Sequence, residues 1–190
     1  MTLRLCSIEK LLLVTGLPGS GKSIFGKTAS RRGIPVINMG DIVREHARER
    51  GLKVTDQNLG TIATELRQKL GKAAIAIIAF EKACQTGRKL AVIEGLRSLE
   101  ELDYFRGKVP KYVLVAFHAS PSTRFKRLLS RGREDDPKTW EEFELRDRRE
   151  LDFGIGSVIA LADIMVVNEN ITLEQLSAVV ENLLESIIEG

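Results

Sequence analysis

The sequence has little of several features that define specialised protein classes. Its 190 residues include only two cysteines, one tryptophan and 5% aromatic residues, and the formal net charge is +3. The longest uninterrupted apolar stretch, residues 73–80, is far shorter than the roughly 18 to 20 residues that a membrane-spanning helix needs. A short apolar run at residues 11–14 has no small-residue cleavage pattern after it. We therefore expect a cytoplasmic protein with no secretory signal and no membrane partner.

The two cysteines and the small charge surplus exclude further classes. Cys6 and Cys84 lie far apart without a CxxC or Cys/His spacing, which argues against a structural zinc and against a disulfide framework. We expect both to be small buried hydrophobes. With 29 basic and 26 acidic residues, the surplus is too small by itself to indicate a nucleic-acid partner. Any basic function must come from local clustering, and the oligomeric state stays open.

The pattern of apolar runs predicts one α/β domain over residues 1–190. Short apolar runs alternate with stretches of helical periodicity, which is typical of a parallel sheet covered by helices. We expect strands at residues 10–15, 35–37, 90–93, 111–117 and 164–167. Thr172 and Gln175 form a possible capping box for the last helix. Residues 41–71 and 132–144 are too polar for the core, so we expect two mobile insertions there.

Residues 16–23, Gly-Leu-Pro-Gly-Ser-Gly-Lys-Ser, fit the phosphate-loop pattern G-x-x-x-x-G-K-[ST] and directly follow the first strand. Glycines permit the backbone angles that turn successive amide groups toward an anion. Lys22 would reach the β and γ phosphates, and the Ser23 hydroxyl would bind Mg²⁺. A glycine-rich turn with a chance lysine is the alternative. The motif does not separate ATPases, GTPases and kinases. The expected ATP-binding residues here are Gly16, Pro18, Gly19, Ser20, Gly21, Lys22, Ser23 and Ile24.

A second phosphate site is expected where the second strand turns into a helix. Gly40 and Asp41 are followed by Arg44, and here the chain resembles the adenylate-kinase-like nucleoside monophosphate kinases. The resemblance covers residues 11 to about 170. It implies a three-layer P-loop kinase fold with a five-stranded parallel sheet in the order 2-3-1-4-5, and it places all three residues at the acceptor phosphate. Without it, Arg44 reads equally well as a surface arginine on an amphipathic helix.

The third strand ends in Glu94, followed by Gly95, Leu96 and Arg97. A carboxylate at this position beside a phosphate loop is typical of a Mg²⁺ site, although it could instead cap the next helix. The comparable stretch of the family is usually Asp-Gly-x-Pro-Arg. This chain has Glu for Asp, and its arginine comes one residue early without the proline. By resemblance, Arg97 also binds the acceptor.

Basic residues cluster after the fourth strand. Arg124, Arg127 and Arg131 share one helix face. The stretch is similar to the family segment that leads into the lid, which implies that Arg127 stacks on the donor base and that Arg131 stabilises charge in the transition state. Residues 132–136, Gly-Arg-Glu-Asp-Asp, resemble the family's lid, and Arg133 would close onto the phosphates.

A later helix, expected from residue 140 to residue 150, carries two more candidate arginines. The family returns arginines from this helix to the phosphates. We choose Arg146 over Arg149, because Asp147 and Glu150 could pair with Arg148 or Arg149 on a solvated face.

The basic cluster also has an alternative reading, because an arginine-rich helix suits a nucleic-acid backbone. Aromatic residues that would stack on bases are sparse here. We therefore consider a nucleic-acid partner the weaker reading. His46 and His118 have no metal-ligand spacing, and we expect both to be structural.

The features together predict an ATP- and Mg²⁺-dependent kinase. ATP would donate its γ-phosphoryl group to a nucleoside monophosphate or a similar phosphate-bearing acceptor, with Lys22, Arg131, Arg133 and Arg146 as catalytic residues. The chain most resembles an archaeal adenylate-kinase-related or dephospho-CoA-kinase-like group. One alternative is a dephospho-CoA kinase, in which Asp41 could serve as the base for a hydroxyl acceptor. The other is a nucleotide-switched ATPase that acts on an RNA or protein partner.

Overall fold

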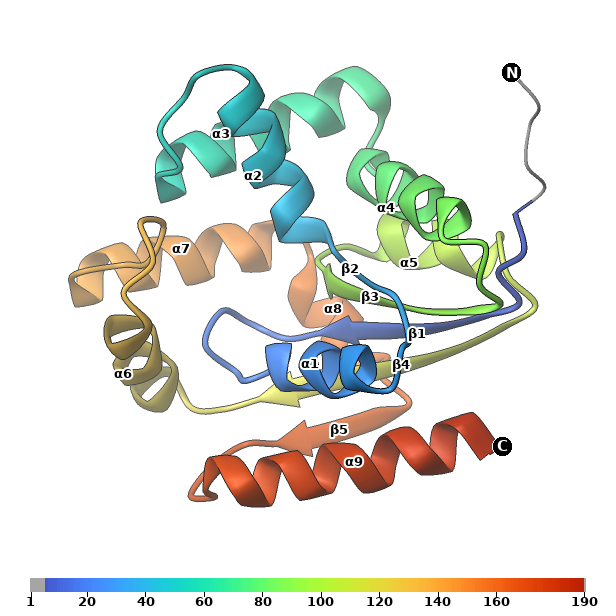
Figure 1. Ribbon diagram of the computed structural model, residues 1–190. Coiled ribbons are helices and arrows are strands. Elements are labelled where there is room, and N and C mark those ends of the chain that lie inside the picture. Colours follow the sequence, from blue (N-terminus) through green and yellow to red (C-terminus); the bar gives the residue numbers. More distant parts are fainter. Residues whose placement is uncertain (1–5, 190) are drawn as a thin grey trace.

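A five-stranded parallel sheet forms the centre of the protein, and the computed structural model describes residues 6–189. The strand order is β2-β3-β1-β4-β5, with every neighbouring pair parallel, as expected from the sequence. Figure 1 shows the carboxyl ends of the strands on the left, where α6 and α7 also lie. The strands are β1 (Lys10–Thr15), β2 (Val36–Asn38), β3 (Leu90–Leu96), β4 (Lys111–His118) and β5 (Ile164–Val167).

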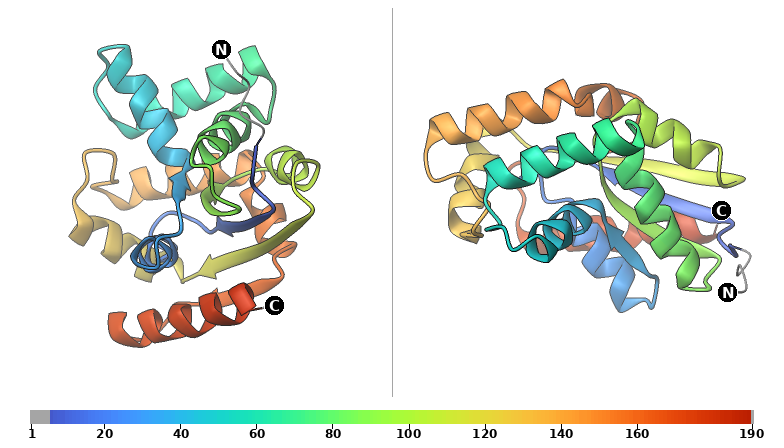
Figure 2. Two further views of the ribbon diagram at one scale, coloured as in Figure 1. Left: turned by 45° about the vertical axis from the view of Figure 1, so that its right-hand side comes forward. Right: turned by 90° about the horizontal axis from the view of Figure 1, so that it is seen from above.

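Helices cover both faces of this sheet (Figures 1 and 2). One face packs against α1 and α9, and the other against α4, α5 and α8 with α2 and α3 beyond them. No helix within residues 6–189 is long and apolar enough to cross a membrane. The helices are α1 (Ser23–Arg31), α2 (Met39–Glu49), α3 (Asp56–Leu70), α4 (Ala74–Gln85), α5 (Leu99–Arg106), α6 (Pro121–Arg131), α7 (Trp140–Asp152), α8 (Ile155–Ala160) and α9 (Leu173–Glu189).

The central strand explains why the strands are nearly all apolar. Successive side chains of a strand point to opposite faces of the sheet. Leu11 and Leu13 of β1 belong to the core beneath α4 and α5, whereas Leu12 and Val14 belong to the core beneath α1 and α9. All four are fully buried. The middle of a strand that is covered on both faces is therefore apolar.

The prediction that residues 41–71 contribute nothing to the core was wrong. Ile42, Val43 and Ala47 of α2 and Ile62 and Leu66 of α3 are buried and belong to the core on the α4 side. Both helices are amphipathic, so a polar average composition concealed an apolar face.

The expected start of the last helix is confirmed. The backbone N–H of Thr172 donates to Gln175 Oε1 at 2.8 Å, and the N–H of Gln175 donates to Thr172 Oγ1 at 3.2 Å. The pair satisfies two amide groups that a helix start otherwise leaves without partners.

The two cysteines form a disulfide, which corrects the prediction that they are buried hydrophobes. Cys6 and Cys84 are bonded, with Cα atoms 4.7 Å apart, and Cys6 is exposed. They are 78 residues apart in sequence, so no local spacing signals the pair. The fold brings them together because the segment before β1 passes the C-terminal end of α4. The bond ties that segment to a helix of the β2 side of the sheet.

We predict that Cys84→Ser lowers the free energy of unfolding by about 2–4 kcal/mol, because closing a long loop restricts the unfolded chain. Urea unfolding with and without reductant measures the loss. Reductant should destabilise the wild type to the same extent and leave the variant unchanged. Two free thiols in the native wild type, found by thiol titration without reductant, would contradict the pairing.

Candidate functional site

The phosphate loop, residues 16–23, connects β1 to α1. Gly16, Gly19 and Gly21 all have positive φ angles, of 143°, 84° and 98°. A Cβ atom on Gly16 would lie 2.5 Å from the carbonyl oxygen of Phe117 at the end of β4. Only glycine fits there, so the loop lies close against the carboxyl ends of the strands with its amide groups at the start of α1.

Lys22 is the last loop residue before α1, and its side chain folds back over the loop. Its Nζ donates to the carbonyl oxygen of Gly16 at 3.0 Å. Burial and the nearby Arg97 lower the pKa of Lys22 to about 8, although Glu94 and Glu150 act in the opposite direction. The charged ammonium is therefore disfavoured in the protein without a ligand, and an anion beside it would relieve that cost.

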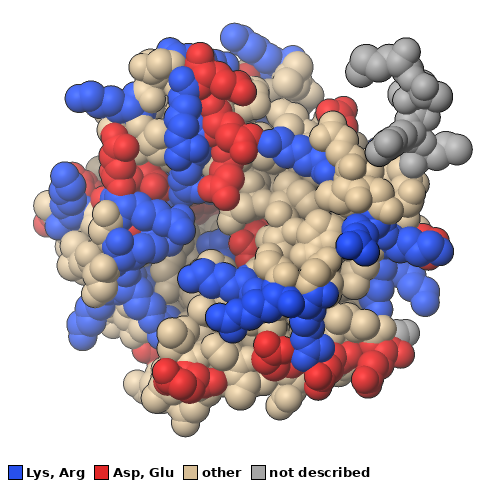
Figure 3. Space-filling view, in the orientation of Figure 1, with Lys and Arg blue, Asp and Glu red and all other residues tan. Residues whose placement is uncertain are grey.

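The loop forms the floor of a cavity, which we call the main cavity, at the carboxyl end of the sheet. Within residues 6–189 its lining includes seven basic side chains but only two acidic ones, Glu94 and Glu150. On the face seen in Figure 3, basic side chains also gather over α1 and α6, whereas acidic ones line α9. The basic lining residues are Lys22, Arg44, Arg97, Arg127, Arg131, Arg133 and Arg146.

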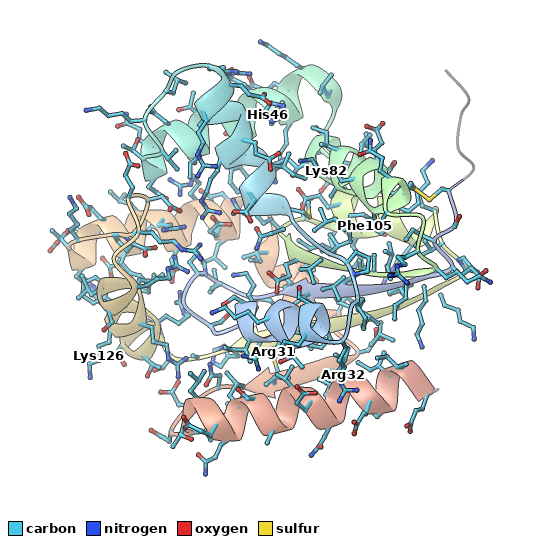
Figure 4. All side chains as sticks on the ribbon, in the orientation of Figure 1. Arg31, Arg32, His46, Lys82, Phe105 and Lys126 are labelled. Carbon is cyan, nitrogen blue, oxygen red and sulfur yellow. A yellow bond between two sulfur atoms is a disulfide. The ribbon has the colours of Figure 1, made fainter. Side chains whose placement is uncertain are left out.

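Other basic residues are separate from this cavity. Figure 4 labels Arg31 and Arg32 at the end of α1 near α9, and Lys126 on the outer side of α6. Arg32 forms ion pairs with Glu181 and Glu185 of α9 at 2.7 Å each. These residues are not among those that line the main cavity. The positive charge of the cavity therefore comes from the lysine and arginines that the sequence analysis selected, and not from these other basic residues.

One end of the cavity, where the sequence predicts the acceptor site, is built around the first turn of α2. Asn38 caps this helix, since its Oδ1 accepts from the N–H groups of Gly40 at 2.9 Å and Asp41 at 3.3 Å. Gly40 and Arg44 line the main cavity, as expected. Asp41 does not. It is exposed, and it holds Arg44 by an ion pair at 2.9 Å.

Glu94 lies at the end of β3, between α1 and α2. Its two carboxylate oxygens accept from the N–H of Gly26 and from Nδ2 of Asn38, both at 3.0 Å. Burial raises the pKa of Glu94, while Lys22, Asn38 and Gly26 lower it. The carboxylate therefore links α1 to the cap of α2, and it also lines the main cavity.

A divalent cation would find few protein ligands here. No group of three or more His, Cys, Asp or Glu residues in the described part of the chain could hold a metal ion. Ser23 and Glu94 both line the main cavity. This donor set fits Mg²⁺, which usually keeps several waters and is bound together with nucleotide phosphates rather than in an all-protein cage.

Residues 132–144, which we call the lid segment after its predicted role, contact arginines of the cavity lining through two aspartates. Asp135 is buried and accepts from Arg44 Nη2 at 2.8 Å, and its carbonyl oxygen accepts from Arg146 Nη1 at 2.7 Å. Asp136 is also buried and accepts from Arg131 Nε at 2.9 Å. Arg44 lowers the pKa of Asp135 against the effect of burial. Arginines expected at phosphates thus lie against lid carboxylates in this structure.

The arginines of α6, which were expected on one face of the helix, have different surroundings. Arg127 lines the main cavity, and its Nη2 donates to the carbonyl oxygen and Oδ1 of Asn168 at 3.1 Å each. Arg124 is buried instead, where Nη1 donates to Asp147 Oδ1 at 2.8 Å and to the carbonyl oxygen of Pro18 at 3.2 Å. Arg124 is therefore a support for the phosphate loop.

On α7, Arg146 lines the main cavity as expected, but the reason given for choosing it was wrong. Asp147 pairs with Arg124, and Glu150 with Arg97 at 3.2 Å. Arg149 is held by two bonds to Asp56, at 2.8 and 2.6 Å, from the start of α3. These acids have distant partners that no helical spacing could reveal.

Two expected ATP-binding residues do not line the main cavity. Ser20 is fully buried, and Ile24 packs against the core beneath α1 and α9. The other expected residues of the phosphate loop do line it. His46 bonds through Nδ1 with the carbonyl oxygen of Ile42 at 2.9 Å, and His118 is exposed at the end of β4.

Sequence reasoning assigned no role to four residues at the site: Asn38, Asn168, Asp135 and Glu150. Asn38 had a usable signal, because asparagine is a preferred helix cap and Gly40-Asp41 follows it. Asp135 lies within the recognised lid pattern. Glu150 is one helical turn after Arg146, so the two share a face. Asn168 offered no signal. It contacts the loop only because β5 ends beside it, where Nδ2 donates to the carbonyl oxygen of Ser20 at 2.9 Å.

Comparison with known proteins places the chain in a family. A family model described as an AAA domain matches residues 15–144. A UPF0200 protein of Thermococcus kodakarensis is 49% identical over 182 residues, which cover 94% of this chain and 98% of the relative. The chain belongs to this AAA domain family and to the UPF0200 family.

Solved structures resemble this UPF0200 chain in fold. A shikimate kinase from Bacteroides thetaiotaomicron has a TM-score of 0.59 at 15% identity, with 93% of this chain and 97% of that chain covered. A gluconokinase from Sinorhizobium meliloti has a TM-score of 0.55 at 20% identity, with 98% and 96% covered. The fold is therefore that of P-loop kinases.

We predict that Lys22→Met makes the protein without ligand more stable and unable to turn over nucleotide. The charged lysine is disfavoured by burial, so at pH 7 the substitution should raise the free energy of unfolding by about 1–3 kcal/mol. Between pH 8 and about 10.5 the wild type gains stability, because its unfolded state binds more protons at this lysine, and the difference should shrink.

Urea unfolding from pH 6 to pH 10 measures this effect, with Lys27→Met on the exposed side of α1 as the matched control. A Lys22→Met protein that is less stable than the wild type at pH 7, or that keeps wild-type turnover, would show that the assignment of this lysine is wrong.

Proposed function

We propose that the chain is an ATP-dependent kinase of a small molecule, with a nucleoside monophosphate or a similar phosphate-bearing compound as the acceptor. The observation that carries this proposal is the convergence of seven basic side chains on one cavity above the phosphate loop. They come from the loop, α2, the end of β3, α6, the lid segment and α7. An anion-rich reaction centre is the chemistry that such a lining stabilises.

Support for ATP as the donor comes from the loop and from α6. The loop amides and Lys22 suit the phosphates, and the positive end of the α1 dipole adds to the field. Arg127 suits the base, since its Nη1 is buried and has no hydrogen-bond partner in the described part of the chain. Mg²⁺ held with ATP by Ser23, with Glu94 beside it, would offset negative charge on the phosphates.

Support for a phosphate-bearing acceptor comes from Arg44 and Arg97. Both line the main cavity, and Glu101 fixes Arg97 by accepting from its backbone N–H at 2.7 Å. A guanidinium offers a planar set of donors that matches a phosphate. When the acceptor binds, its phosphate can take the place of Asp135 at Arg44. Arg131, Arg133 and Arg146 are then left to stabilise charge on the transferring group.

The comparisons support a kinase more than its alternatives, because the shikimate kinase and the gluconokinase share the fold. No described feature favours a partner RNA or protein. A hydroxyl acceptor such as dephospho-CoA would need a base, and Asp41 is exposed and paired with Arg44. We therefore place the reaction at a phosphate-bearing small molecule.

A transfer assay tests the proposal directly. Purified protein with Mg²⁺ and ATP is incubated with AMP, CMP, UMP, GMP, dephospho-CoA or no acceptor, and both phosphorylated product and free phosphate are measured. We expect transfer to at least one nucleoside monophosphate, with little phosphate release in its absence. Transfer to dephospho-CoA alone would move the reaction to a hydroxyl. Release without any transfer would instead identify an ATPase.

A further inference from the structure

Glu150 is a buried carboxylate at the acceptor end of the site that the proposed mechanism does not use. It lies on α7 one turn after Arg146, and only 2% of the residue is exposed. It lines the main cavity and also a smaller neighbouring cavity, the side cavity, which reaches Val43 and Leu59 between α2 and α3. Glu150 therefore stands where the two cavities meet.

The other buried or half-buried acids around the site each accept at least two hydrogen bonds from the protein. Asp56 takes both bonds from Arg149, and Glu94 takes one each from Gly26 and Asn38. Asp135 is held by Arg44 and Arg146. Each of these carboxylates is part of the scaffold.

Glu150 differs from them. In the described part of the chain its one ion-pair partner is Arg97, at 3.2 Å between Oε1 and Nη1, and no hydrogen bond to the carboxylate accompanies that contact. An ionised carboxylate offers about four acceptor positions, and buried polar groups are as a rule hydrogen-bonded. Glu150 lines both cavities, and none of their other described lining groups donates a hydrogen bond to its carboxylate. A ligand that satisfies this carboxylate must itself bring a donor.

The lining of the cavities limits the kind of ligand further. Among the described residues that line them, none is aromatic, so no ring is present on which an acceptor base could stack. Arg44, Arg97 and Arg146 border both cavities. The acceptor end thus combines several arginines with a carboxylate, that of Glu150, which has acceptor positions to spare.

We propose that Glu150 is a specificity-determining residue that accepts a hydrogen bond from a hydroxyl group of the acceptor, while Arg44 and Arg97 hold the acceptor's anionic group. The acceptor class is then a compact hydroxylated anion, of the kind that a phosphorylated polyol represents. This inference rests on the proposed function and narrows its acceptor. The substrate's anion and its hydroxyl group are recognised by adjacent groups of opposite charge.

Calorimetric binding tests the inference with two probes that differ only in hydroxyl groups: glycerol 3-phosphate and n-propyl phosphate. Both are titrated into the full chain in the presence of Mg²⁺ and a non-hydrolysable ATP analogue. We expect the wild type to bind glycerol 3-phosphate at least about tenfold more tightly. Glu150→Gln, which keeps the side-chain volume, should lose most of that preference. Asp152→Asn, at an exposed position of the same helix outside the lid segment, should retain it.

Three outcomes would overturn the inference. The wild type shows no preference for glycerol 3-phosphate, or the preference survives in Glu150→Gln, or neither of the two probes binds. Unfolding curves of both variants show whether a change in binding reflects a change in folding. Failure of the proposed function looks different, because then the ATP analogue itself would not bind. If the analogue binds and AMP is phosphorylated equally by wild type and Glu150→Gln, the inference alone fails.

Discussion

Repulsion among the seven basic side chains around the main cavity is the constraint on which the rest of the site depends. Four buried acids, Glu94, Asp135, Asp136 and Glu150, counter it from the end of β3, the lid segment and α7. These acids do not offset the cost of burying the charged Lys22, so the pKa of Lys22 is lowered to about 8. A cavity of this kind favours ligands that bring several negative charges. In this structure the carboxylates of Asp135 and Asp136 accept hydrogen bonds from Arg44 and Arg131, two of the arginines that line the cavity.

The sheet topology explains how residues distant in sequence reach one cavity. β1 is central, and the chain leaves it for α1 on one face, whereas it leaves β3 for α5 on the other. Open parallel sheets bind ligands at the carboxyl ends of strands where the connections diverge in this way. Glycines in the phosphate loop allow the backbone to lie against β4 there. The disulfide lies at the opposite end of the sheet, before the start of β1.

Features that depend on a local sequence pattern could be predicted from the sequence. Apolar runs located all five strands, and the phosphate loop follows from eight consecutive residues. Pairing between distant segments was beyond reach, because Cys6 with Cys84, Arg124 with Asp147 and Arg149 with Asp56 depend on which elements the fold brings together. Glu150 was read as part of a solvated face. In the structure Glu150 is buried and lines the main cavity, which the sequence pattern around it does not indicate.

Steady-state kinetics of Arg44→Ala and Arg131→Ala, with ATP and the acceptor varied in turn, test most directly whether the cavity binds two substrates at distinct ends. Arg44→Ala should raise the acceptor KM with little effect on ATP, whereas Arg131→Ala should mainly lower kcat, because its charge acts on the transferring group. Arg48→Ala and Arg148→Ala, at exposed positions of α2 and α7, should leave both unchanged. Unaltered transfer in Arg44→Ala and Arg131→Ala, together with weaker and less salt-dependent RNA binding, would contradict the account and assign the arginines to nucleic acid.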